Sequence, residues 1–161
     1  MKLIRIFLSL FFLLAFCPAG TAQASIPSYT FTVNSTANGQ QDANPGDGIC
    51  ANFDGLCSLR AAVGEANALG SGGAVNVTII LARNAAHTGN GSIEITADSI
   101  SIQTEPGAGS QATVTFEIGF IVSSGTLIVN DVSFSNAGGF LVLNPDSRLS
   151  LFNATLNSNS R

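Results

Sequence analysis

The last third of the chain repeats its own apolar pattern, and this repeat restricts the possible folds more than any other feature. Five apolar residues recur 22 positions further along the chain. A repeat of about 20 to 50 residues, built from short apolar alternations and polar turns, is typical of a solenoid. The matched pairs are Leu127 with Leu149, Val129 with Leu151, Phe134 with Leu156, Ile118 with Phe140 and Phe120 with Val142.

Each repeat contains three short strands, which decides between two kinds of solenoid. Leucine-rich repeats have a similar period, but they require leucines at fixed positions and usually a helical segment in each repeat. Here residues 120–122, 127–129 and 132–134 each alternate apolar and other side chains. Asp131 and Asn153 fall at equivalent turns, where their side chains can stack in a ladder. Three strands per repeat predict an all-β chain, a parallel β-helix of about three coils.

The same alternation begins well before the repeat, after the only helical pattern in the chain. Residues 29–33 predict a first strand, and residues 34–56 form a loop dense in Asn, Asp and Gly. Ser58 can cap a helix, Gly70 is expected to stop it, and Gly64 within it costs about 1 kcal/mol relative to alanine. Because a β-helix exposes an apolar cross-section at its end, we expect a short N-terminal capping α-helix. Its apolar side is formed by Leu59, Ala62, Val63, Ala66 and Leu69.

The first 24 residues have the pattern of a secretory signal peptide. Lys2 and Arg5 precede an apolar run over residues 6–17, which is shorter than the roughly 20 residues that a membrane-spanning helix needs. Small residues at 22 and 24 predict cleavage between Ala24 and Ser25. The alternatives are an uncleaved membrane anchor and a lipid-modified Cys17. We therefore expect a secreted or cell-surface protein with no membrane span after cleavage.

Charge and cysteine content narrow the function of the processed chain. It keeps four arginines and no lysine against ten carboxylates, a net charge of −6, which disfavours nucleic acid as a partner. Its two cysteines, Cys50 and Cys57, are an even number in an exported chain and predict one disulfide. A zinc site is the alternative, but two thiols without a nearby histidine do not complete a tetrahedral shell.

Several motifs resemble the CSLREA family of exported bacterial and archaeal proteins. The match covers residues 31–67; the sequence departs from the family motif at Ala61, where the motif has glutamate. The resemblance implies a right-handed parallel β-helix of the pectin-lyase-like kind, with residues 25–73 as its cap segment and 74–161 as its coils. It implies little about activity. The matching motifs are Phe31-Thr-Val-Asn-Ser-Thr36, Asp42-Ala-Asn-Pro-Gly-Asp-Gly-Ile-Cys50, Cys57-Ser-Leu-Arg-Ala-Ala62 and Glu65-Ala-Asn67.

The loop before the helix contains the best candidate for a ligand site. Asp42, Asn44 and Asp47 carry oxygen atoms of the kind that calcium prefers, although their spacing is not that of an EF-hand. The alternative is a turn, with the Pro45-Gly46 step setting the bend and the aspartates bonding to backbone amides. We favour the turn and keep calcium as the only cofactor to be considered.

We assign no catalytic residue. Pectin-lyase-like glycosidases need carboxylates on neighbouring strands, whereas the carboxylates of the coil region are isolated in sequence. His87 stands alone in a Gly/Asn-rich segment, which is more typical of a surface histidine, and Arg83 and Arg148 have no acidic cluster beside them. Two hypotheses follow: a structural or adhesin-like module that contacts a glycan or a surface protein, and a carbohydrate-active enzyme. A strip of aligned carboxylates favours the enzyme, and a smooth Ser/Thr/Asn face favours the module.

The last coil is not followed by a helix, an aromatic plug or a charged strand. Solenoids need capping repeats at both ends. We therefore expect that the coil region is a truncated copy of a longer β-helix, or that it self-associates through an open C-terminal coil.

Overall fold

The computed structural model describes residues 24–116, 119–135 and 139–157, which form twelve strands and one helix. The helix is α2 (Leu59–Ser71). None of the described helical residues belongs to a helix long and apolar enough to cross a membrane. The strands are β1 (Ser28–Val33), β2 (Asn76–Leu81), β3 (Ala86–Gly89), β4 (Ile93–Ile95), β5 (Ser99–Thr104), β6 (Ala112–Phe116), β7 (Phe120–Val122), β8 (Thr126–Asn130), β9 (Val132–Ser135), β10 (Phe140–Val142), β11 (Arg148–Phe152) and β12 (Thr155–Asn157).

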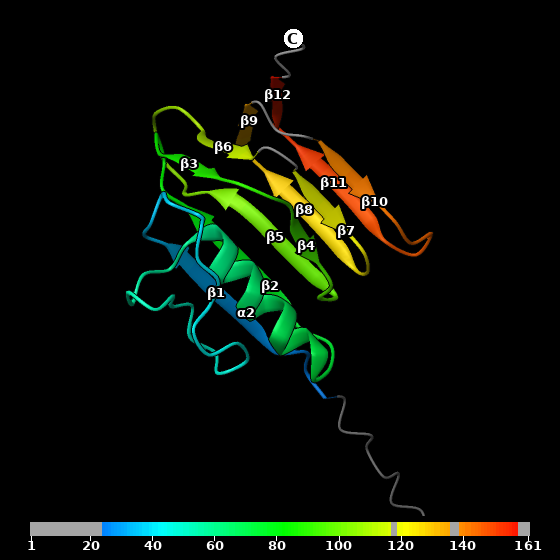
Figure 1. The fold of residues 1–161 in the computed structure, drawn as a ribbon. Coiled ribbons are helices and arrows are strands. Elements are labelled where there is room, and N and C mark those ends of the chain that lie inside the picture. The colour runs from blue at the N-terminus through cyan, green and yellow to red at the C-terminus, as the bar shows by residue number, and fades with distance from the viewer. Residues whose placement is uncertain (1–23, 117–118, 136–138, 158–161) are drawn as a thin grey trace, which may run out of the picture.

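These strands build three parallel sheets. The five-stranded sheet has the order β1-β2-β5-β8-β11, the four-stranded sheet β12-β9-β6-β3 and the three-stranded sheet β10-β7-β4. The chain visits the three sheets in turn, so β2–β4, β5–β7 and β8–β10 form three coils, and β11 and β12 begin a fourth. The predicted parallel β-helix of about three coils is therefore confirmed (Figure 1).

The 22-residue offset holds in two sheets and fails in the third. Leu149 pairs with Leu127, and Leu156 pairs with Phe134, as predicted. Phe140, however, pairs with Phe120 at an offset of 20, so the predicted match of Phe120 with Val142 is wrong; the other, Ile118, lies outside the described residues. The turn over residues 143–147 is two residues longer than its counterpart at 123–125, and this absorbs the difference. A shift of two residues leaves the same side chains facing inward, because strands have a period of two.

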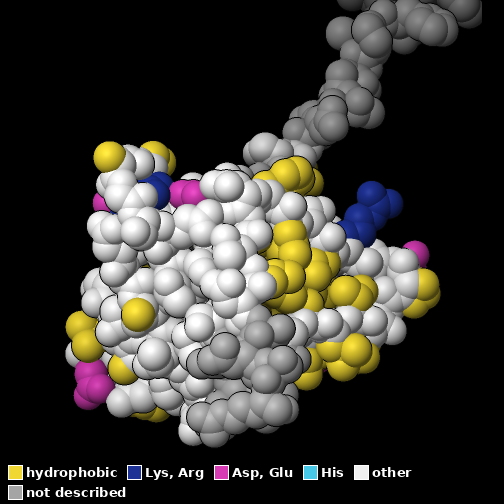
Figure 2. Space-filling view, turned by 90° about the horizontal axis from the view of Figure 1, so that it is seen from above, with side chains coloured by type: hydrophobic (Ala, Val, Ile, Leu, Met, Phe, Trp, Pro, Cys, Tyr) yellow, Lys and Arg dark blue, Asp and Glu magenta, His cyan; other side chains and the backbone are white. Residues whose placement is uncertain are grey.

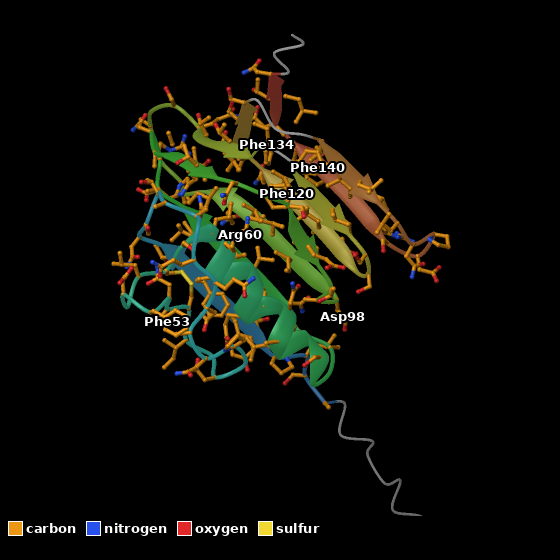
Figure 3. All side chains as sticks on the ribbon, viewed as in Figure 1. Phe53, Arg60, Asp98, Phe120, Phe134 and Phe140 are labelled. Atoms are coloured by element: carbon orange, nitrogen blue, oxygen red, sulfur yellow. A yellow bond between two sulfur atoms is a disulfide. The ribbon has the colours of Figure 1, made fainter. Side chains whose placement is uncertain are left out.

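The interior of the solenoid is filled by the inward side of every coil. Burial alternates along β2, β5 and β9 in the way the sequence predicts. Three phenylalanines from β7, β9 and β10, namely Phe120, Phe134 and Phe140, meet with ring centroids 5.0–5.9 Å apart (Figure 3). Edge-to-face and stacked contacts of this kind contribute beyond the burial of apolar area.

Helix α2 covers the N-terminal end of the coils, as expected. Ser58 caps it by accepting a hydrogen bond from the Ala61 N–H at 3.1 Å, and its apolar side is buried in the core. The expected stop at Gly70 is wrong, because the helix continues to Ser71 and is capped at Gly72. Gly70 has a different role: a Cβ there would lie 2.9 Å from the Ala97 Cα and Cβ, so glycine allows the helix to approach the coil.

His87 lies inside the molecule, which corrects the expectation of a surface residue. It occupies β3, which the sequence did not predict, and only 1% of it is exposed. Burial lowers the pKa of His87, and the Ser35 backbone opposes this only in part. Neither ring nitrogen forms a hydrogen bond of good geometry with the described part of the chain.

Candidate functional site

The acidic loop is held against α2 by carboxylates. Glu65, fully buried on the helix, accepts hydrogen bonds of 2.5 Å from the backbone N–H groups of Gly46 and Gly48. The two oxygens of Asp42 accept from Asn44 and Ala51, each at 2.9 Å. Each of these side chains therefore satisfies two backbone donors of the loop.

This arrangement bears on the calcium prediction. Asp47 accepts a bond from the Ile49 N–H at 2.8 Å, so Asp42 and Asp47 both bond to backbone amides as the turn interpretation requires. Asn44 takes part through its backbone N–H. Among the described residues, no group of three or more His, Cys, Asp or Glu side chains is placed to hold a metal ion. Calcium at Asp42, Asn44 and Asp47 stays a prediction.

The predicted disulfide is present. The sulfur atoms of Cys50 and Cys57 are 2.05 Å apart and their Cα atoms 5.1 Å apart, so the bridge joins the loop to the residue before the helix cap. Phe53, at the tip of the closed loop, is 83% exposed (Figure 3).

A polar hollow of about 410 Å³ lies between α2 and the first coil. Arg60 enters it and donates hydrogen bonds to the carbonyls of Asn38, Asn90 and Ser92, so the guanidinium joins the loop to the coil. Burial lowers the pKa of Arg60. Asn67 bonds across the same gap to the backbone of residues 94, 96 and 97. The polar groups that line the hollow therefore hold the cap to the coils.

The predicted ladder between Asp131 and Asn153 is confirmed. The Asn153 Nδ2 donates to Asp131 Oδ1 at 2.7 Å, and both residues adopt positive φ, 47° and 56°, at equivalent turns. Gln111 donates to Asp131 at 3.1 Å, and Arg83 pairs with it at 2.8 Å. These hydrogen bonds, first from Gln111 and then from Arg83, lower the pKa of Asp131. Arg83 thus stabilises a turn by neutralising a single carboxylate.

Among the described residues, the outward carboxylates do not align into a strip. Glu94, on β4, is in register with Ile121 and then with Leu141 on the following coils, and it accepts a hydrogen bond from Ser123 at 2.5 Å. Asp98 lies in the turn before β5 (Figure 3). The sequence alone did not decide whether carboxylates one coil apart meet, and Glu94 meets none on the following coils. Glu117, a further carboxylate of the coil region, lies outside the described residues.

The four-stranded sheet instead presents a regular array of hydroxyl groups, which we call the hydroxyl face. Strand pairing places Thr88 beside Thr115, and Thr113 beside Ser133, which is followed by Thr155. Only Thr155 bonds a side chain, that of Gln111; the other hydroxyls of the face have no hydrogen-bond partner within the described residues. The side chains of the face are Thr88, Thr113, Thr115, Ser133, Ser135 and Thr155.

The sequence reasoning missed the hydroxyl face, although its signal was present. Thr113-Val-Thr115 and Ser133-Phe-Ser135 alternate hydroxyl and apolar residues, and the strand prediction depends only on the apolar members. No family model, no curated protein and no solved structure matches this chain.

Proposed function

We propose that this chain is an exported, non-catalytic β-helix module of a secreted or cell-surface protein, and that it contacts a glycan through the hydroxyl face. One observation carries the proposal: five hydroxyls of an uncharged sheet surface are free of partners in the described structure. The pattern of the first 24 residues supports export. The disulfide is of a kind that persists in oxidising compartments.

The geometry of the hydroxyl face suits a repeating, uncharged polymer. Neighbouring strands lie about 4.8 Å apart, and outward side chains recur about every 6.6 Å along a strand. Each hydroxyl donates one hydrogen bond and accepts others, as sugar hydroxyls do. The threonine methyl groups add apolar contact with the faces of sugar rings. Many weak contacts on a rigid surface sum through multivalency.

A carbohydrate-active enzyme is the second hypothesis, and no observation on the described residues favours it. Such an enzyme needs two carboxylates at a separation that suits a water molecule or a nucleophile. Glu94 is in register with apolar residues, and Asp131 is paired with Arg83. Incubation with soluble glycans tests this hypothesis, because release of reducing ends by the purified protein would favour the enzyme.

The binding experiment removes hydroxyls without changing shape. The double substitution Thr113→Val and Thr115→Val keeps the branched side chains and deletes two hydroxyls from the face. We expect at least about a tenfold loss of affinity for whichever of insoluble cellulose, chitin or peptidoglycan the protein binds, at roughly 1 kcal/mol per hydrogen bond. Thr30→Val with Thr78→Val, on the outward side of the five-stranded sheet, is the matched control. Equal losses in both variants, or no binding by the original protein, contradict the proposal.

A further inference from the structure

The end formed by β10, β11 and β12 is apolar and, within the described residues, lacks the cover that α2 gives to the other end. Each of these strands is the last of its sheet, so one edge has no strand partner within the described chain. A hollow of about 450 Å³ opens among Phe134, Phe140, Leu149, Leu151 and Leu156. Hydrophobic side chains gather there in Figure 2, which views this end of the molecule. The exposed large side chains of this end are Leu141, Val142, Leu143, Leu151, Phe152 and Leu156.

The hydrogen-bonding groups of β11 fall into two sets. The Arg148 N–H donates to the Gly125 carbonyl, and the Phe152 carbonyl accepts from Asp131, so these residues face the preceding coil. Backbone groups of successive strand residues point in opposite directions, which turns the N–H and C=O groups of Leu149 and Leu151 toward the open edge. This edge is a template for another strand.

The sequence of β11 fits a second copy of itself. Its central segment, Leu149-Ser-Leu151, reads the same in both directions, with Ser150 at its centre. In an antiparallel pair centred on Ser150, Leu149 lies opposite Leu151 of the second copy, and both are inward-facing residues of their coils. Between residues 139 and 157 the charged residues are Asp146 and Arg148, of opposite sign, so two such ends do not repel each other.

We propose that two copies of this chain join end to end through β11, around a two-fold axis that passes beside Ser150. Antiparallel pairing satisfies the open backbone groups of Leu149 and Leu151 in both copies, and the two apolar hollows close on each other. A two-fold contact uses the same surface on both copies and ends at the dimer. The capped N-terminal ends then lie at the two far ends of the assembly. This inference does not depend on glycan binding.

A cysteine at the two-fold axis tests the geometry. Ser150 would face Ser150 of the second copy as a non-hydrogen-bonded pair, with Cα atoms about 4.5 Å apart, which is within reach of a disulfide. We expect Ser150→Cys to give a covalent dimer under mild oxidation. Ser101→Cys is the matched control, because Ser101 lies on β5, an inner strand paired on both sides. Equal cross-linking of the two variants overturns the proposal.

Sedimentation of the uncross-linked protein gives a second, independent readout. We expect twice the monomer mass for the original protein and a loss of the dimer in Leu151→Pro, since the Leu151 N–H is unused within one copy and proline is tolerated at an edge. Phe53→Ser removes an exposed aromatic residue from the opposite end and should leave the dimer intact. A monomer at all concentrations, open-ended oligomers, or a dimer that survives Leu151→Pro while circular dichroism is unchanged contradicts the two-fold contact.

Discussion

The two ends of this β-helix solve the same physical problem in opposite ways. At the N-terminal end the sequence departs from the repeat, and α2 covers the first coil while Glu65, Arg60 and Asn67 bond the loop and the coil backbone. At the other end the repeat simply continues into β11 and β12, and inward positions such as Leu156 are 57% exposed. Extending a solenoid therefore needs only the alternating pattern, whereas closing it needs polar side chains at particular positions.

The largest loss of stability is expected at the N-terminal end, when the Glu65 carboxylate is removed. Glu65→Ala leaves two loop N–H groups without their charged acceptor, and each such bond contributes about 1.5–3 kcal/mol. We expect the free energy of unfolding in urea to fall by about 4 kcal/mol. Glu105→Ala, which removes an exposed carboxylate from a turn, is the control and should change it little. Similar losses in both variants would show that the loop is not anchored by Glu65.

Removing the disulfide should have the next largest effect. With both Cys50 and Cys57 replaced by serine, the unfolded chain regains the freedom of a closed loop of eight residues. The chain-entropy model assigns this roughly 2–3 kcal/mol. The midpoint of urea unfolding measures it, and a midpoint equal to that of the original protein would contradict the prediction.

The pH dependence of stability should report on the burial of His87. Because burial lowers its pKa in the folded protein, the unfolded chain binds the proton more readily. The stabilising contribution is complete above the unfolded pKa of about 6.5 and is lost as the pH falls toward the folded pKa. We expect unfolding free energies measured between pH 8 and pH 5 to decline, and the decline to be smaller in His87→Leu. An identical slope in that variant would exclude His87 as its source.

A smaller effect of opposite sign is expected inside the helix. At Gly64 an added Cβ would lie 3.9 Å from Asp42, an ordinary contact, so Gly64→Ala should stabilise by about 1 kcal/mol. At Gly70 the same substitution would place the Cβ 2.9 Å from Ala97 and should destabilise. Thermal unfolding of the two variants measures the contrast; a gain at both positions would show that α2 can move away from the coil.

The smallest effect is predicted at the open end. Leu156→Ala, measured at protein concentrations below dimerisation, removes a side chain that water already reaches, and should cost about 0.5 kcal/mol or less. Leu127, an inward leucine on β8 of the preceding coil, is by contrast fully covered, so Leu127→Ala should cost about 2–5 kcal/mol. Equal costs would mean that the end is covered in solution even in the monomer.

The sequence predicted the coils better than the contacts between distant segments. Alternation fixes which side chains face inward, so the interior residues of β2, β5 and β9 were identified from their pattern alone. It does not fix the register, because the turn before β11 gains two residues without disturbing the alternation. His87 was misplaced because β3 carries no apolar residue of useful size on its inward side.

The candidate sites, too, were predictable where a local pattern decides and not where distant segments meet. The disulfide was predictable because only two cysteines follow the predicted cleavage site. The anchoring by Glu65 was not, since its partners lie 17 and 19 residues earlier in a loop without a repeating pattern. The hydroxyl face depends on strand pairing across coils, which no local pattern gives.

The pairing of β1 with β2 has a consequence for the order in which the molecule forms. Some 42 residues separate these two strands, and the helix between them bonds to residues as late as Ala97. A chain that emerges with its N-terminus first therefore carries a cap with nothing to close until its middle has appeared. The bond between Cys50 and Cys57, seven residues apart, can form ahead of that moment. We therefore expect the cap to take up its final position only after the first coil has been made.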